Sequence, residues 1–182
     1  LMQEDSFAAS AFNSGHISAY TDPDGVFRHA VMLIKVDDKY FPALSLAVFL
    51  DYARVPFASV IVNWGEHIII PPVKGSLLEK EVRIPIDEKG RAFIPYPQTW
   101  EKGFSKMEAH KLLELYADKN LRGNLTDFFE GNFVLIADIA VGASDLGQTP
   151  LESDAPLAGI HASFLNGMLT DTFYSKWTNR QV

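Results

Sequence analysis

Residues 133–138 (FVLIAD) constrain the fold of this chain more than any other segment, because five apolar residues precede the first polar one. A strand with one exposed face alternates apolar and polar residues, whereas an unbroken apolar run is typical of a strand buried on both faces. Such strands lie inside parallel or mixed sheets that helices cover on each side. The sequence therefore predicts an α/β fold, in which a mixed sheet is flanked by helices and residues 133–137 form its central buried strand.

Helical patterns occur on both sides of this run. Apolar residues at helical spacing predict a buried helix over residues 43–53 and another from about residue 159 to about residue 169. The capping-box pattern at residues 105–108 predicts a further helix that extends to about Lys119. The order of helical and strand patterns along the chain supports the α/β class.

Shorter apolar segments bounded by turn residues predict the remaining strands. Residues 87–90 end in glycine, and this turn predicts a hairpin that pairs residues 82–86 with residues 92–94. The other predicted strands are residues 30–36, 60–62 and 67–70. The sequence contains no internal repeat and no long linker, so we expect residues 1–182 to form a single domain.

The composition excludes several classes of protein. The chain contains no cysteine, which excludes a disulfide scaffold, a cysteine-ligated metal site and a thiol nucleophile. Its 16 lysine and arginine residues and 23 aspartate and glutamate residues give a net charge of -7. An acidic chain repels phosphate backbones, so we predict no nucleic-acid partner.

The ends and the apolar runs bear on location. No apolar run approaches the roughly 20 residues that a membrane-spanning helix needs. The first residues lack the basic start and the apolar stretch of a signal peptide. Because the chain begins with Leu1 rather than methionine, we expect it to be a piece of a longer protein.

A loop of small residues follows the predicted central strand and leads to the last helix. Ligands of α/β proteins commonly bind at such a strand end. The candidate ligand-binding residues there are Gly142, Ser144, Asp145, Thr149 and His161. Backbone N–H groups at the helix start would favour an anion. In the alternative interpretation, Asp145, Thr149 and His161 form a structural hydrogen-bond network that holds the loop down.

The same region supports an alternative function, a freestanding hydrolase that uses Asp138, Asp145 and His161. An acid beside a histidine can supply a base and its orienting group, or two metal ligands. The sequence contains no nucleophile elbow, no dinucleotide-binding fingerprint, no Walker loop and no paired-histidine metal motif. We therefore predict no cofactor, no metal and no catalytic residue, and keep the hydrolase as the alternative.

Six segments, taken in their order along the chain, resemble the motifs of one protein family. They are DPDGVFR (22–28), YFPALSLA (40–47), IPIDEKG (84–90), GNFVLIA (131–137), GASDLGQTPL (142–151) and PLAGIHA (156–162). Together they resemble the type-two CHASE domain, the cyclase/histidine-kinase-associated sensory extracellular domain, over roughly residues 7–173. The chain departs from the family pattern at Ala137, where the family has glycine, and at Pro95, where it has asparagine.

The resemblance implies a location and a role. Domains of this family lie outside the cytoplasmic membrane of bacteria, and membrane helices join them to a cytoplasmic nucleotide cyclase, histidine kinase or Ser/Thr kinase. The resemblance thus implies an extracytoplasmic sensory domain that is not itself an enzyme. It would bind an unknown small-molecule or protein signal, relay it through flanking membrane helices and work as a homodimer. A further alternative is a dimerisation spacer without a ligand, with Phe173, Tyr174 and Trp177 as interface anchors.

Overall fold

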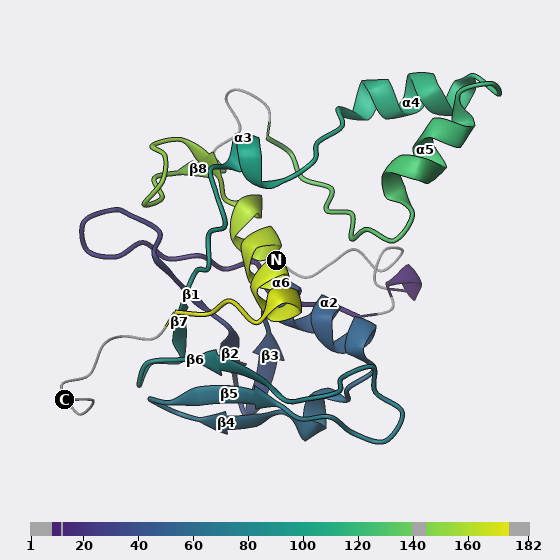
Figure 1. Cartoon of the computed structure of the whole chain (residues 1–182). Helices are drawn as coiled ribbons and strands as arrows, with labels where there is room; N and C mark the ends of the chain where they lie inside the picture. The colour runs from purple at the N-terminus through teal and green to yellow at the C-terminus, as the bar shows by residue number, and fades with distance from the viewer. Residues whose placement is uncertain (1–8, 12, 140–144, 175–182) are drawn as a thin grey trace.

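The computed structural model describes residues 9–11, 13–139 and 145–174, and it confirms the α/β class (Figure 1). The strands are β1 (His29–Val31), β2 (Leu33–Val36), β3 (Lys39–Pro42), β4 (Ile61–Asn63), β5 (His67–Ile70), β6 (Val82–Pro85), β7 (Arg91–Phe93), β8 (Leu146–Gly147) and β9 (Ala155–Pro156). The helices are α2 (Leu44–Ala53), the 3-10 turn η1 (Phe57–Ser59), α3 (Trp100–Gly103), α4 (Ala109–Ala117), α5 (Arg122–Phe129) and α6 (Ala158–Thr170). The two helices predicted over residues 43–53 and 159–169 are therefore confirmed as α2 and α6.

The sheets differ from the single mixed sheet that we predicted. Across the described residues, the strands pair antiparallel in four small sheets, β1-β7, β2-β3, β4-β5-β6 and β8-β9. The predicted hairpin is wrong in its pairing, although its turn is present, since the Asp87 N–H donates to the Arg91 carbonyl at 2.9 Å. β6 pairs with β5 instead, and β7 pairs with β1. The physical reason is side-chain packing, because the β5–β6 register sets Ile68 opposite Ile84 and both are fully buried.

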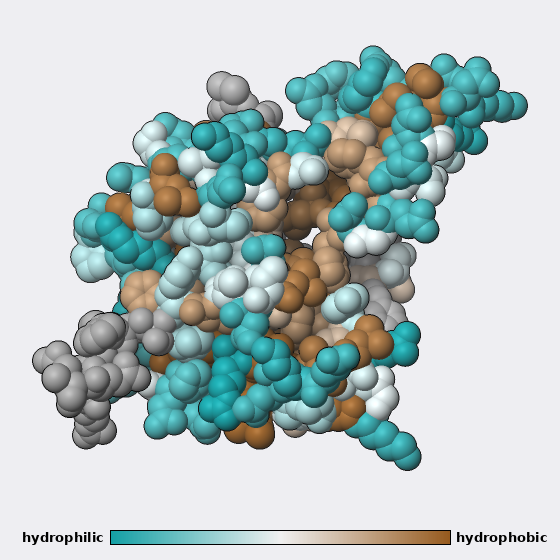
Figure 2. Space-filling model, in the orientation of Figure 1, coloured by the Kyte–Doolittle hydropathy of each residue, from teal (hydrophilic) through white to brown (hydrophobic). Residues whose placement is uncertain are grey.

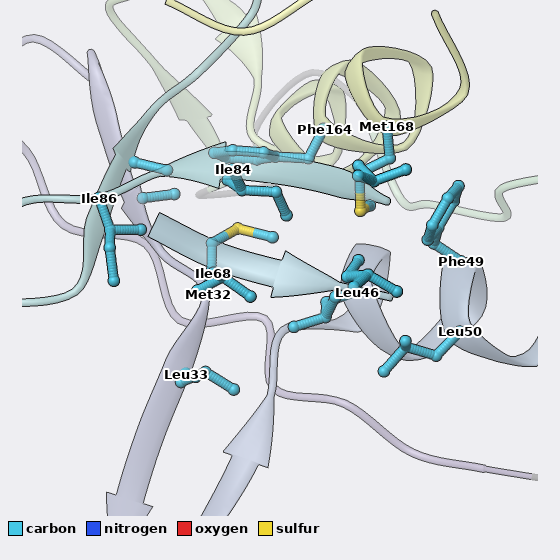
Figure 3. Close-up of a cluster of buried hydrophobic side chains, with 14 of the residues drawn as sticks. Met32, Leu33, Leu46, Phe49, Leu50, Ile68, Ile84, Ile86, Phe164 and Met168 are labelled. Atoms are coloured by element: carbon cyan, nitrogen blue, oxygen red, sulfur yellow. The ribbon is translucent and has the colours of Figure 1, made fainter. Parts of the chain in front are cut away.

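The hydrophobic core lies between the β4–β6 sheet and the two helices α2 and α6, which pack on each other. Figure 3 shows the buried side chains of these elements gathered in one cluster. Its largest fully buried members are Phe49, Phe164, Met32, Leu46, Ile68, Ile70 and Ile84. Burying one such side chain contributes about 1.5–3 kcal/mol, so this cluster supplies much of the stability of the domain.

Small residues on α6 let neighbouring segments approach the helix closely. Gly159, Ser163 and Gly167 recur at intervals of four, and all three are buried. A Cβ added to Gly159 would lie 3.1 Å from the ring of Trp100, and one added to Gly167 would lie 2.6 Å from Pro95. One face of α6 is therefore approached by Pro95, which follows β7, and by Trp100, the first residue of α3.

The predicted central strand is wrong. Residues 133–139 lie in no helix or strand and are exposed, with Ile136 reaching 92% exposure. They form an extended connection that returns from the α4–α5 helix pair, which projects from the body (Figure 1). An apolar run becomes a buried strand only where a neighbouring strand accepts its backbone hydrogen bonds. Here the first residue of the run contacts α2, where the Phe133 ring meets the Tyr52 ring edge-on at 5.1 Å.

The helix predicted to run from residues 105–108 to Lys119 is shorter and more exposed than its pattern indicates. α4 begins at Ala109 with Glu108 as its N-cap, and none of its residues is buried. Figure 2 shows apolar atoms lining the hollow between the α4–α5 pair and the body. No helix in the described ranges is both long and apolar enough to cross a membrane.

Candidate functional site

The segment at residues 13–17, which precedes β1, lies against the start of α2. The His16 N–H donates to the Pro42 carbonyl, and the Leu44 N–H donates to the His16 carbonyl, each at 2.9 Å. A Cβ added to Gly15 would lie 2.6 Å from the Cα of Leu44, so only glycine fits here. This close approach holds His16 at the junction of α2 and α6.

His16 lies beside His161, which comes from the first turn of α6. Both ring nitrogens of His16 and Nδ1 of His161 are buried and have no hydrogen-bond partner among the described residues. Burial lowers the pKa of His16 to about 4, and the neighbouring His161 contributes to the same shift. His16 is therefore a neutral imidazole at pH 7, and none of the residues that the structure describes provides a donor or an acceptor for its ring.

The groups around His161 shift its pKa in both directions. Burial lowers its pKa, whereas a backbone hydrogen bond at Ile17 and the carboxylate of Asp145 act in the opposite direction. The backbone carbonyl of Asp145 accepts from the Leu157 N–H at 2.9 Å, which fixes this residue next to the start of α6. The structure thus brings His16, His161 and Asp145 together from three separate parts of the chain.

A separate concave feature includes Pro150 and Leu151 of the loop that precedes α6. It is a cleft of about 330 Å³ lined by Arg28, Phe93, Ile94, Tyr96, Pro150, Leu151 and Tyr174. Arg28, its one charged lining residue, pairs with Asp24 at 2.9 Å and with Asp22 at 3.5 Å. The cleft therefore presents a mostly apolar and aromatic surface whose cation is already neutralised.

A comparison with models of protein families matches the CHASE2 domain over residues 2–182. The chain belongs to the CHASE2 family. The resemblance noted in the sequence is thereby confirmed, and CHASE2 domains are sensory domains of signalling proteins that generally lie outside the cell. Comparisons with curated proteins and with solved structures gave no match.

The residues predicted to bind a ligand in this CHASE2 domain fall into three groups. Asp145 and His161 lie close together, as described above. Gly142 and Ser144 fall outside the described residues. Thr149 is buried with 5% exposure, and its Oγ1 accepts from the N–H groups of Leu151 and Glu152 at 3.2 Å each. Its hydroxyl therefore closes a turn within its own loop.

That turn also ties the loop to the chain before α3. The Glu152 carboxylate accepts from the backbone N–H of Trp100 at 2.6 Å. Two of the residues in this loop, Thr149 and Glu152, therefore use their polar atoms to hold backbone in place. This arrangement matches the structural alternative for Thr149 and leaves the role of Asp145 and His161 open to test.

The alternative hydrolase needs Asp138 to join Asp145 and His161. Asp138 lies in the exposed connection after α5 rather than at the end of a buried strand. The carboxylate that acts on His161 is that of Asp145. No three acidic or histidine side chains in the described ranges are placed to hold a metal ion.

His16 is the residue that sequence reasoning missed. It stands alone between Gly15 and Ile17, with no neighbouring histidine or acid that would mark it as part of a site. Its partner is in a helix near the other end of the chain. No local signal in the sequence could have found this pair, because the tertiary structure alone brings the two rings together.

Proposed function

We propose that this chain is the extracytoplasmic signal-input domain of a bacterial membrane-bound signalling protein. Its output would be a nucleotide cyclase, a histidine kinase or a Ser/Thr kinase on the cytoplasmic side, reached through flanking membrane helices. The observation that carries this proposal is the CHASE2 match, which spans residues 2–182. The domain itself would bind or sense a signal and perform no chemistry.

A relay needs contact between the sensing part and the chain that enters and leaves the domain. The entering segment contacts α6 at His161, which lies beside His16 and forms a hydrogen bond with the backbone of Ile17. The leaving segment contacts it through Phe173, whose ring lies 3.2 Å from where a Cβ on Gly167 would be. A shift of α6 would therefore reach both flanks, which supports α6 as the element that transmits the signal.

The signal must favour one of two arrangements of the domain, since a ligand that binds both equally shifts nothing. We propose the region around Asp145, Thr149 and His161, with Gly142 and Ser144, as the place where a small-molecule or protein signal acts. We also propose that two copies work together as a homodimer, because membrane-bound cyclases and kinases act through paired output domains.

The parent reading frame provides the first test. We expect apolar stretches of roughly 20 residues on its flanks and a cyclase or kinase domain beyond them. Reporter fusions placed at either end of residues 9–174 should then report an extracytoplasmic position for this segment. A stop codon soon after Val182, combined with no membrane segment upstream, would contradict the proposal and favour a freestanding protein.

A further inference from the structure

We propose that His16 and His161 form a proton-binding site, through which acidification releases the segment at residues 13–17 from α6. This inference rests on the proposed function and deepens it, because it names the proton as a signal that the domain senses. The observation behind it is the pair of histidine rings, three of whose ring nitrogens are buried and have no hydrogen-bond partner in the part of the chain that the structure describes.

Unpartnered buried nitrogens are unusual in a folded protein. Most buried polar atoms have a partner, and leaving one without a partner destabilises the folded state. A structural histidine would be held by a donor or an acceptor at each nitrogen, which would also set its tautomer. Here both ring nitrogens of His16 and Nδ1 of His161 have no partner among the described residues, while His161 also forms a hydrogen bond with the Ile17 backbone, so added protons have a place to bind.

A metal ion fits this site less well than a proton does. Two imidazoles supply two ligands, whereas a structural zinc site takes four and a catalytic one takes three. The described residues contain no group of three side chains that could hold a metal. The site therefore offers bases without the coordination sphere that a metal would need.

Within residues 9–11, 13–139 and 145–174, few charged groups face the pair. On α6 the only ionisable residue is His161, and on α2 they are Asp51 and Tyr52, both exposed. Asp51 accepts from the side-chain amide of Asn13 at 3.2 Å. In the loop before α6, Asp145 acts on His161.

Two further acids of this loop, Glu152 and Asp154, form hydrogen bonds away from the pair. Glu152 accepts from the Trp100 N–H, and Asp154 accepts from the Ser153 hydroxyl at 2.7 Å. Of these described carboxylates, that of Asp145 acts on the pair, and it does so through His161.

The number of charges at the site determines how protonation affects it. A first proton on His161 is stabilised by the backbone hydrogen bond with Ile17 and by the Asp145 carboxylate, so this step alone does not release the segment. A second proton on His16 would place two positive charges side by side with one negative charge, in a partly desolvated site. Separation of the two rings relieves that repulsion. The segment that can move is the one carrying His16, since His161 is built into α6.

The pH dependence follows from the sign of the shifts. We call the arrangement in the structure, with residues 13–17 against α6, the closed state, and the arrangement with this segment released the open state. The pKa of both histidines is lowered in the closed state, and that of His16 falls from 6.5 to about 4. Between these values the open state binds more protons, so the closed state loses stability as the pH falls from about 6.5 towards about 4. Above pH 6.5 the rings are neutral in both states, and the closed state keeps its full stability.

The experiment uses the 182-residue chain and a variant in which both histidines cannot titrate, H16Q combined with H161Q. Between pH 7.5 and pH 5, we expect the Tm of the unmodified chain to fall by roughly 4–8 °C more than that of the double variant. The matched control is His110→Gln, which removes an exposed histidine of α4 and should leave the full pH effect in place. Equal losses in the unmodified chain and the double variant would overturn the proposal.

An NMR titration of the histidine ring protons tests the same proposal in the unmodified chain, in case the double variant does not fold. We expect one ring to titrate well below pH 6, with cleavage by a nonspecific protease within residues 13–17 increasing over the same range. Titration of all five histidines near pH 6.5 would overturn the proposal. So would a Tm that depends on added Zn²⁺ or on a chelator, which would indicate a metal site.

The failure of this inference can be separated from failure of the proposed function. Proton sensing is tested by the output activity of the full-length parent when the external pH falls from 7.5 to 5. The unmodified parent is compared with a parent that carries both H16Q and H161Q. An output that ignores pH would overturn proton sensing, while the topology measured by reporter fusions would still support the signal-input role.

Discussion

The body of the domain and its α4–α5 projection both contain apolar side chains but differ in how many of these are buried. In the body, Ile68 and Ile84 are fully buried under α2 and α6. In the projection, Leu125 is the buried residue of the two helices, and the apolar run that follows is exposed. This difference shows that the apolar character of a segment sets how much free energy its burial could contribute to stability. Contacts made across long stretches of sequence decide whether that gain is realised.

The largest expected contrast is between a core residue and the apolar run. Phe164→Ala should lower the free energy of unfolding by about 3–5 kcal/mol, because it removes a fully buried ring and leaves a cavity. Ile136→Ala should change it by no more than about 0.5 kcal/mol, because that side chain faces solvent. Urea unfolding of both variants measures the contrast. A loss above about 2 kcal/mol for Ile136→Ala would show that the run is buried in solution.

Two glycines provide a contrast of opposite sign. A Cβ on Gly147 would lie 2.4 Å from the ring of buried Phe27, so Gly147→Ala should destabilise the domain by about 1–3 kcal/mol. A Cβ on Gly123 in α5 meets no atom within 4 Å, so Gly123→Ala should stabilise α5 by up to about 1 kcal/mol. Thermal unfolding and the helical circular dichroism signal measure both effects. Equal losses in the two variants would contradict the difference between body and projection.

The smallest expected effect concerns local opening rather than global unfolding. Few buried side chains hold the projection, so it should open with little free energy and be cut first by a protease. Limited trypsin digestion, read by mass spectrometry, should cleave at Lys111, Lys119 and Arg122 before it cleaves at Lys80 or Lys89. These last two residues are exposed on the body and serve as the matched control. Cleavage at similar rates would show that the projection is as stable as the core.

Some residues of the candidate site could be predicted from the sequence, whereas others are placed there only by the tertiary structure. The position of Asp145 next to the start of α6 could be expected from the sequence, because loop and helix are adjacent along the chain. The turn made by Thr149 also follows from a local rule, since threonine hydroxyls accept from backbone N–H groups close in sequence. His16 could not be expected, because no pattern around it points to α6.

The sequence by itself determined the elements whose signals are local. α2 and α6 follow from helical spacing, and the turn at residues 87–90 follows from its acidic start and its glycine. The ordered set of motifs was also sufficient to indicate the CHASE2 family.

The tertiary structure alone decided which strands pair, which apolar segments are buried and which side chains meet at the His16–His161 site. β6 pairs with β5 rather than with β7, which follows it in the sequence. Residues 133–137 are exposed, although their composition is that of a core strand. The physical reason is that backbone preference and side-chain period are properties of a few adjacent residues. Strand pairing, burial and lowered pKa values depend instead on groups that are far apart in sequence and are brought together only when the whole chain packs.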